Sequence, residues 1–282
     1  MESLMQAYEL VRAERVRGSS WALATLARGV LEDLESGRRL DCGRAASLIR
    51  RAFPGSGALE NLAWIVSGLC GEWGRLEDSL RRLLDLVDRG AVEASSRAAS
   101  VIGGFDVVVT ISFSRAVSEA LAAARPGRVV VLQSLPGGEG VFAARHLRER
   151  GLRVELAPDS SAGRFLGEGS VAVFGADAAG IDGCVANKLG SLTLAAAARA
   201  LGSSVIAVFE SYKIVERPIC RGLGVEERSY TVEGWGKVRY PLLDVTPPEL
   251  VTVVVTERAV ARPERGWMEA LRNSFLEEVL GA

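Results

Sequence analysis

The sequence predicts an α/β protein, with an N-terminal helical domain followed by a C-terminal Rossmann-like domain, a parallel sheet with helices on both faces. Two observations support this fold class. Up to about residue 100, apolar positions recur at helical spacing and no run is typical of a strand. From Phe105 onward, short β-branched runs alternate with alanine-rich stretches, the pattern of a parallel sheet covered by helices. We expect domains over residues 1–100 and 101–282.

The helical domain is expected to be interrupted mainly by a loop rich in proline and glycine. Apolar positions between Trp21 and Leu34 follow helical spacing. Proline and glycine disfavour helix interiors, so the loop Phe53-Pro54-Gly55-Ser56-Gly57 must end one helix before another begins near Leu59.

The C-terminal domain is expected to hold short strands and a final helix. Its predicted strands span 106–110, 128–133, 153–157, 171–174, 204–209 and 250–256. Residues 267–280 are amphipathic and predict a helix. No G-x-G-x-x-G motif follows the first strand, so NAD is not implied and we expect no cofactor.

Charge and composition exclude several classes of partner. A formal net charge of −1 and a pI near 6.1 give no basic surface for nucleic acid, so we expect no direct nucleic-acid contact. The N-terminus is charged from its second residue and lacks the apolar core of a secretory signal, which predicts a cytoplasmic protein. No stretch predicts a membrane span.

The cysteines and the single histidine suggest no metal site. Cys42, Cys70, Cys184 and Cys220 are scattered without a C-x-x-C pair, so we expect reduced thiols, with neither a zinc site nor a disulfide framework. His146 lies in a charged helical segment, which predicts a solvated position. Acid/base chemistry must therefore rest on a carboxylate, a thiol, lysine or water.

Polar residues follow two predicted strands of the region 171–213. Asp177 comes after one strand and Lys213 after the next, so both should face the crevice at the carboxyl ends of the sheet. Asn187 and Lys188 are placed at the start of the intervening helix, where free N–H groups favour an anion such as phosphate. The alternatives are a turn aspartate for Asp177 and an ordinary helix start for Asn187 and Lys188.

Two further segments are candidates for phosphate binding. Ser112, Ser114 and Arg115 end the strand at 106–110 and could either cradle a phosphate or cap a helix. The segment Arg17-Gly18-Ser19 could let backbone approach a ligand closely, but a plain helix start is the simpler interpretation.

Several motifs together resemble a known superfamily. They are Gly175-Ala176-Asp177 with Asn187-Lys188, the segment 210–213 (ESYK), the segment 244–250 (DVTPPEL) and Thr256-Glu257. This combination resembles the alpha, beta and delta subunits of translation initiation factor 2B, a superfamily that includes ribose-1,5-bisphosphate and methylthioribose-1-phosphate isomerases. The resemblance runs from Arg17 to about Pro263. Its specific signatures are the Gly175-Ala176-Asp177 and Asn187-Lys188 pair and the DVTPPEL segment, whereas the R-G-S motif by itself is weak.

The resemblance implies a ligand cleft between the two domains and dimers or larger assemblies. In the isomerases a cysteine and an aspartate form the catalytic pair, and Asp177 stands at the aspartate position. Asn187, Lys188 and Lys213 match substrate-binding residues, and Arg17-Gly18-Ser19 is similar to the phosphate loop.

Departures from the isomerase pattern affect catalysis and phosphate binding. The motif T-H-C is replaced by Thr110-Ile111-Ser112, so the thiol and the histidine are missing, and a serine hydroxyl is far less acidic than a thiol. R-P-T reads Phe53-Pro54-Gly55, with Arg51 as a substitute, and S-R-P reads Ser134-Leu135-Pro136. Lost guanidinium groups would weaken binding of a bisphosphate. Cys184 could replace the thiol, although a small buried residue is the simpler interpretation.

These observations lead to one main functional hypothesis and two alternatives. The first is a regulatory protein that binds a phosphorylated sugar or nucleotide with weak or no catalysis. It would act as a homodimer or larger assembly, with initiation factor 2 as a candidate partner. The second is an aldose-ketose isomerase that uses Asp177 with Ser112 or Cys184. The third is a purely structural partner of initiation factor 2. A cleft plugged by Leu135 and Phe53 would favour this third hypothesis.

Overall fold

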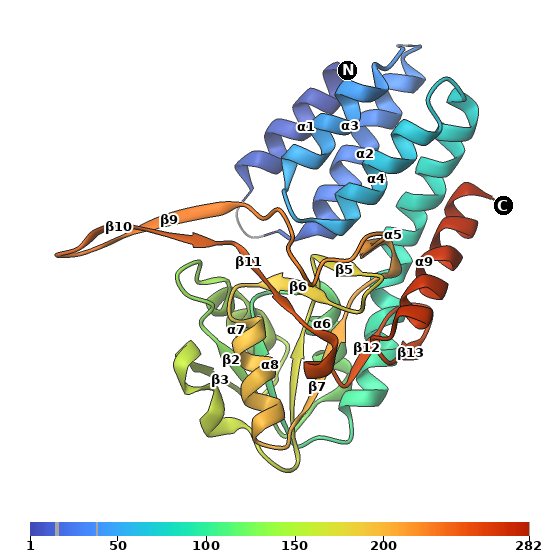
Figure 1. Cartoon of the computed structure of the whole chain (residues 1–282). Helices are drawn as coiled ribbons and strands as arrows, with labels where there is room; N and C mark the ends of the chain where they lie inside the picture. Colours follow the sequence, from blue (N-terminus) through green and yellow to red (C-terminus); the bar gives the residue numbers. More distant parts are fainter. Residues whose placement is uncertain (15–16, 38, 282) are drawn as a thin grey trace.

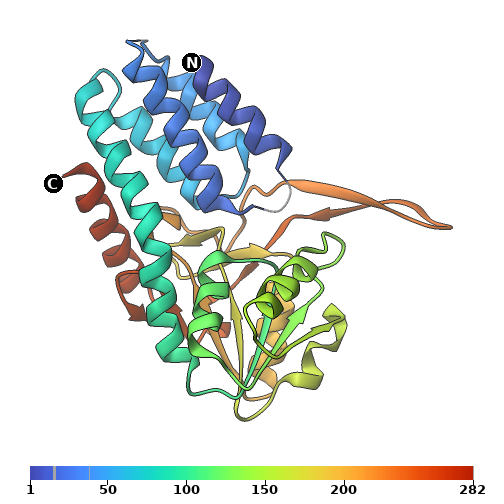
Figure 2. The ribbon, with the colours of Figure 1, turned by 180° about the vertical axis from the view of Figure 1, so that it is seen from behind.

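The computed structural model describes residues 1–14, 17–37 and 39–281. An N-terminal helical part lies at one end of the molecule and an α/β part at the other (Figure 1). The helical part contains α1 (Glu2–Ala13), α2 (Ser19–Glu35), α3 (Cys42–Ala52), α4 (Gly57–Gly68) and α5 (Trp73–Ile102). α5 runs the length of both parts, as the view from behind also shows (Figure 2). The expected α/β class is confirmed.

Local sequence explains where the helices begin and how they pack. The side chain of Asp41 accepts a hydrogen bond from the backbone of Arg44 and caps α3, and Ser56 does the same for α4. Gly29 allows α2 to approach α1 closely, because a Cβ there would lie 2.9 Å from the Cβ of Ala7. The apolar faces of these helices form one core.

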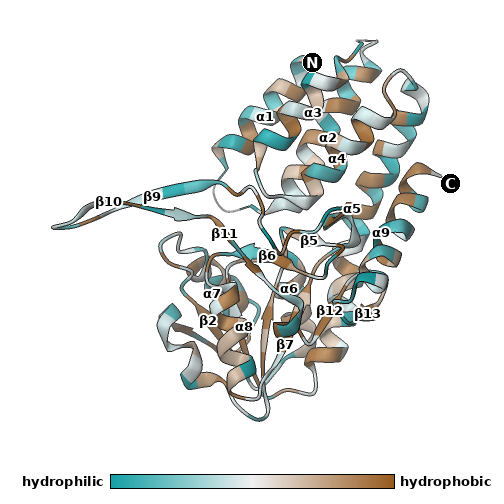
Figure 3. Ribbon diagram, in the orientation of Figure 1, coloured by the Kyte–Doolittle hydropathy of each residue, from teal (hydrophilic) through white to brown (hydrophobic). Residues whose placement is uncertain are grey.

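A seven-stranded sheet forms the centre of the α/β part, in the order β13-β12-β7-β4-β1-β2-β3. Its strands are β1 (Val107–Ile111), β2 (Arg128–Leu132), β3 (Val154–Ala157), β4 (Ser170–Phe174), β7 (Ser204–Val208), β12 (Val253–Val255) and β13 (Val260–Ala261). Neighbours are parallel except β12 and β13, which are antiparallel. Figure 3 shows hydrophobic colouring along β7 and hydrophilic colouring along β9.

Helices cover both faces of this sheet, as the sequence predicts. Alternate residues of each strand enter different cores, as Val108 and Val109 do. One face packs against α6 (Arg115–Ala124), α7 (Glu139–Glu149) and the end of α5; the other packs against α8 (Ser191–Ala200) and the 3₁₀ segment η1 (Asp159–Phe165).

The last helix, α9 (Arg265–Leu280), connects the two parts. Met268 and Leu271 join a core of the sheet, whereas Phe275 and Val279 join the core of the helical part. Among the described residues, no helix is long and apolar enough to cross a membrane.

Short strands missing from the sequence prediction form a second sheet and a hairpin. The second sheet has the order β11-β6-β5-β8, from β5 (Ala178–Gly180), β6 (Val185–Lys188), β8 (Ile214–Val215) and β11 (Leu243–Thr246). Strands β9 (Glu227–Val232) and β10 (Gly236–Pro241) form a hairpin that projects from the body (Figure 1).

The four cysteines form two disulfides, so the expectation of reduced thiols is wrong. Cys42 is bonded to Cys70, and Cys184 to Cys220. The partners are 28 and 36 residues apart in sequence, too far for any short spacing motif to pair them. The fold brings their Cα atoms to 6.0 and 5.4 Å, within the range that a disulfide spans.

Candidate functional site

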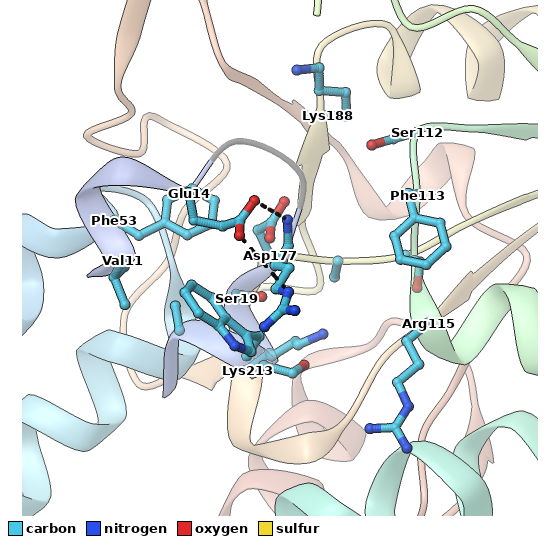
Figure 4. A pocket seen from close by; sticks show the side chains of 18 of the residues that line it. Val11, Glu14, Ser19, Phe53, Ser112, Phe113, Arg115, Asp177, Lys188 and Lys213 are labelled. Atoms are coloured by element: carbon cyan, nitrogen blue, oxygen red, sulfur yellow. Dashed lines mark hydrogen bonds and ion pairs between the residues drawn. The ribbon is translucent and has the colours of Figure 1, made fainter. Parts of the chain in front are cut away.

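A pocket of about 440 Å³ lies between the helical part and the carboxyl ends of the central strands (Figure 4). Ser112 follows β1 and Asp177 follows β4, and these two adjacent strands mark the point where the sheet order reverses. Ligands of open α/β sheets bind at such a point, because the loops after the two strands diverge and leave a crevice. The pocket therefore occupies the binding position of this fold.

The structure brings most of the sequence-predicted site residues together. The pocket is lined by Arg17, Gly18, Ser19, Ser112, Ser114, Arg115, Asp177, Asn187, Lys188 and Lys213. Arg51 lies outside it, exposed on α3, where its Nε is 3.4 Å from the carbonyl oxygen of Ser47. Phe53 lines the pocket instead. Leu135 is not among the lining residues, so the plugged cleft considered from the sequence is not observed.

Asp177 is held by backbone hydrogen bonds to both parts of the molecule. Its N–H donates to the carbonyl of Ala186 and its carbonyl accepts from the N–H of Gly57, both at 2.9 Å. Burial raises the pKa of the carboxyl group, while Lys213, Ser19 and Lys188 act in the opposite direction. Asp177 and Lys213 thus share one site, as the sequence predicts.

Asn187 and Lys188 end β6 and do not begin a helix, so the prediction of a helix start is wrong for this pair. The helix α8 begins at Ser191, after Gly190 with φ +102°. The amide of Asn187 lies 2.8 Å from the hydroxyl oxygen of Ser191. The pair reaches the pocket from a strand and does not take the position at a helix N-terminus that the sequence predicts.

The start of α8 is capped by Asp244 of the DVTPPEL segment. Its carboxylate accepts hydrogen bonds from the N–H groups of Gly190 at 2.7 Å and Leu192 at 3.2 Å. Burial raises the pKa of Asp244 to about 6 despite these bonds. The acceptor role explains an aspartate at this position.

The raised pKa of Asp244 predicts that stability depends on pH. The folded pKa lies above the ordinary value of 3.8, so the stabilising contribution is complete below that value and is lost as the pH rises through about 6. We expect this group alone to lower the free energy of unfolding by about 2 kcal/mol between about pH 4 and pH 7. Urea titrations at several pH values in this range give the free energy of unfolding as a function of pH. This free energy should change less with pH in Asp244→Asn than in the wild type. An unchanged slope would contradict the assignment.

Both pocket lysines are paired with buried glutamates. Lys188 Nζ lies 2.6 Å from Glu139 Oε1, and Lys213 Nζ lies 2.7 Å from Glu210 Oε2. Neither glutamate is among the site residues that the sequence predicts. The pairing of Glu210 with Lys213 could be predicted from sequence, because the two residues are three positions apart. The pairing of Glu139 with Lys188 could not, because 49 positions separate them.

The helical part holds Lys213 in place through its neighbours. Asn61 on α4 donates hydrogen bonds to the carbonyls of Tyr212 at 2.9 Å and Ile214 at 2.8 Å. The hydroxyl of Tyr212 donates to Ser20 Oγ at 2.9 Å. Lys213 is therefore positioned by contacts between the two parts.

The loop after β1 supplies hydroxyl groups and a cation. Ser112 has φ +64°, an uncommon conformation for a residue other than glycine, and its N–H donates to Ser134 Oγ at 2.7 Å. Ser114 caps α6 by accepting from the N–H of Val117, and Arg115 begins that helix. Ser114 thus has the capping role considered as an alternative, and it also lines the pocket.

Cys184 does not supply the missing thiol. Its sulfur is bonded to Cys220, and the residue is not among those lining the pocket. His146 packs half-buried against Phe113 and Phe142 instead of lying on a solvated face, with ring centroids 5.6 and 6.3 Å away. Of the described residues, no thiol or imidazole lines the pocket.

The charges around the pocket nearly balance. Its described lining residues include Arg12, Arg17, Arg28, Arg115, Lys188, Lys213 and Arg228 on the cationic side and Glu14, Asp88, Glu139, Asp177, Glu210 and Glu226 on the acidic side. Most of these cations pair with a carboxylate, whereas Arg28 and Arg115 have no salt bridge within the described ranges. The pocket offers many donors but little net charge.

The fold and the pocket define a class of protein, in which a helical bundle is joined to a doubly wound α/β unit with a polar pocket at the switch point of its sheet. The Initiation factor 2 subunit family matches residues 74–263, and the chain belongs to this family. The resemblance inferred from the motifs is confirmed.

Similar proteins carry names of two kinds, initiation factor subunit-like protein and isomerase. The chain is 29% identical to a translation initiation factor eIF-2B subunit 2-like protein of Pyrococcus abyssi, over 90% of this chain and 95% of the relative. It is 28% identical to a ribose 1,5-bisphosphate isomerase of Archaeoglobus fulgidus, over 99% and 96% of the two chains.

Solved structures show the same fold. The crystal structure of translation initiation factor eIF-2B from Pyrococcus horikoshii OT3 matches with a TM-score of 0.84 at 28% identity, covering 94% of this chain and 99% of that one. A chain of the tetrameric eIF2B-beta2-delta2 complex from C. thermophilum matches with a TM-score of 0.70 at 19% identity, covering 96% of this chain and 94% of that one. At this identity the similarity is one of fold alone. The same fold is thus found in a chain that is part of a tetrameric complex.

Proposed function

We propose that this protein is an initiation factor 2B subunit-like regulatory protein that binds a phosphorylated sugar or nucleotide in the pocket, with weak or no catalysis. The observation that carries the proposal is the pocket itself, which gathers Arg115, Lys188 and Lys213 around Asp177 at the switch point of the sheet. Serine hydroxyls and cationic side chains at this edge are suited to phosphate oxygens.

Weak catalysis follows from the groups available to start a reaction. Ser112 stands where the isomerases carry a cysteine, and a hydroxyl needs a neighbouring base to become a nucleophile. No imidazole lines the pocket among the described residues, and Cys184 is held in a disulfide. Of the lining carboxylates, Asp177 has no salt bridge among the described residues and its pKa is raised by burial, so it is the best candidate for proton transfer.

The protein would act through assembly with copies of itself, as a homodimer or larger, and initiation factor 2 is a candidate partner. Support comes from the family, whose members form oligomeric complexes. A ligand held between the helical part and the sheet would favour one relative orientation of the two parts. If assembly depends on that orientation, ligand binding and assembly are coupled.

Calorimetry combined with a turnover assay tests the proposal. We expect AMP or ribose phosphates to bind at or below millimolar concentration, Arg115→Ala to weaken binding about tenfold, and no ketose to form. Glu149→Gln, at the far end of α7, is the control and should bind as the wild type does. Absence of binding by any phosphorylated compound would refute the proposal.

An aldose-ketose isomerase is the second candidate. It is favoured by the buried carboxyl of Asp177, whose pKa is raised, and by identity to an isomerase along nearly the whole chain. The same assay separates the two functions. Ketose formation that disappears in Asp177→Asn, while calorimetric binding persists, would establish the isomerase.

A further inference from the structure

A second group of reactive side chains lies outside the pocket, where the turn between β5 and β6 meets the segment that follows β8. The group consists of Asp182, Cys184 and Cys220, whose carboxylate oxygen and sulfur atoms lie within 4.8 Å of one another. None of the three is among the residues that line the pocket. Cys184 is buried, Asp182 is half-buried and Cys220 is exposed. The group is therefore open to solvent on one side.

The fold fixes the carboxylate of Asp182 beside the two sulfur atoms. Its Oδ2 accepts hydrogen bonds from the N–H groups of Ile219 and Cys220, both at 2.9 Å. Gly180 makes room for this side chain, because a Cβ at position 180 would overlap Oδ1 of Asp182. Metal-binding carboxylates are commonly oriented in this way by hydrogen bonds from neighbouring groups.

Reduction of the disulfide would turn this group into a set of metal ligands. Two thiolates and a carboxylate are ligands that Zn²⁺ accepts, and a water molecule can complete the tetrahedron. The disulfide and the metal use the same sulfur atoms, so they belong to two different states of the protein. No short spacing motif reveals such a site, because Cys184 and Cys220 are 36 positions apart.

We propose that reduction of the bond between Cys184 and Cys220 creates a Zn²⁺ site formed by these two residues and Asp182. A dithiol supplies the two electrons. One of its thiolates attacks Sγ of the exposed Cys220, the bond to Cys184 breaks, and closure of the dithiol to a cyclic disulfide releases Cys220. The dithiol loses two hydrogen atoms, which the two cysteines gain as thiols. Zn²⁺ then displaces both thiol protons.

The metal would preserve a cross-link beside the pocket. β5 begins just after Asp177, β6 ends at Lys188 and β8 begins just after Lys213, so the linked strands carry or adjoin pocket residues. The core that contains Cys184 has only five buried members in the described part of the chain, which gives these short strands little apolar burial. A coordinate link would hold the strands together when the covalent link is broken.

The other disulfide provides a control within the same chain. Cys42 is buried and Cys70 is exposed, as in the first pair, but no third ligand of the described residues lies close to them. Protein is reduced with a phosphine, checked by thiol counting, freed of reductant without air and titrated with Co²⁺, whose charge-transfer absorption reports thiolate ligands. We expect reduced wild-type protein and reduced Cys42→Ala/Cys70→Ala to bind a single equivalent. Reduced Cys184→Ala/Cys220→Ala and unreduced wild-type protein should show no such absorption.

Two further measurements test the carboxylate and the folded state. Asp182→Asn can still accept the backbone hydrogen bonds but is a weaker ligand, so its affinity for Zn²⁺ should fall at least about tenfold. Glu168→Gln, in the exposed loop before β4, is the control and should bind Zn²⁺ as the wild type does. Zn²⁺ should raise the melting temperature of reduced Cys42→Ala/Cys70→Ala, because a ligand of the folded chain stabilises it.

Several results would overturn the proposal. They are an absent thiolate absorption in reduced wild-type protein, equal binding by Cys184→Ala/Cys220→Ala, and unchanged affinity in Asp182→Asn. A melting temperature lowered by Zn²⁺ would show that the metal binds the unfolded chain and would also refute the site. None of these measurements depends on a ligand in the pocket, so the proposed function stands or falls separately.

Discussion

Replacing Gly57 with alanine should destabilise the protein by about 3 kcal/mol and weaken binding of the phosphorylated ligand that we propose for the pocket. A Cβ at this position would lie 2.2 Å from the carbonyl oxygen of Lys213 and 3.1 Å from the Cβ of Ala178. The obstructing atom is backbone, so α4 or the segment that carries Lys213 must move. Urea denaturation and calorimetry would measure the two effects.

Gly68, the last residue of the same helix, provides the control. A Cβ at this position would have nothing within 4 Å, so Gly68→Ala should be neutral or stabilise the protein by up to about 1 kcal/mol. If both variants proved equally stable, the close contact between α4 and Lys213 would be refuted.

Removing either disulfide should lower the free energy of unfolding by about 3 to 4 kcal/mol, since each closes a loop of intermediate length. The bond between Cys42 and Cys70 spans 28 residues and that between Cys184 and Cys220 spans 36. We expect this loss for each paired alanine variant, and a larger loss for wild-type protein treated with a phosphine reductant, which breaks both bonds, measured by thermal and urea denaturation.

Thiol counting is the control for this prediction. Unfolded wild-type protein should show no reactive thiol before reduction and four after it, because the structure contains no free cysteine among its described residues. A variant lacking both bonds should not respond to reductant. Four reactive thiols in unreduced protein would contradict the disulfides.

The central sheet could be predicted because its strands are buried on both faces and appear as continuous apolar runs, as β4 does over Ser170–Phe174. β5 and β8 have three and two residues, too few for any periodicity. The hairpin carried a weak signal, since Tyr230 and Val232 alternate with polar residues before Gly234. Short strands depend on neighbours that sequence alone does not identify.

The candidate site could be predicted where it depends on the ends of strands. Asp177 and Lys213 follow consecutive strands along the chain, and the parallel sheet brings them to one edge. The partners of the lysines depend on packing between separate elements. Glu139 reaches Lys188 only because α7 begins beside β6, and the pairing of Cys184 with Cys220 depends on a loop whose path has no local signature.

The position of α9 has a consequence for how the protein folds. Phe275 and Val279 complete a core whose other described members come mainly from residues 4–87, so the helical part lacks some of its packing until α9 docks. These contacts join segments far apart in the sequence, and they form more slowly than local contacts. A folding intermediate without docked α9 therefore exposes an apolar groove on the helical part.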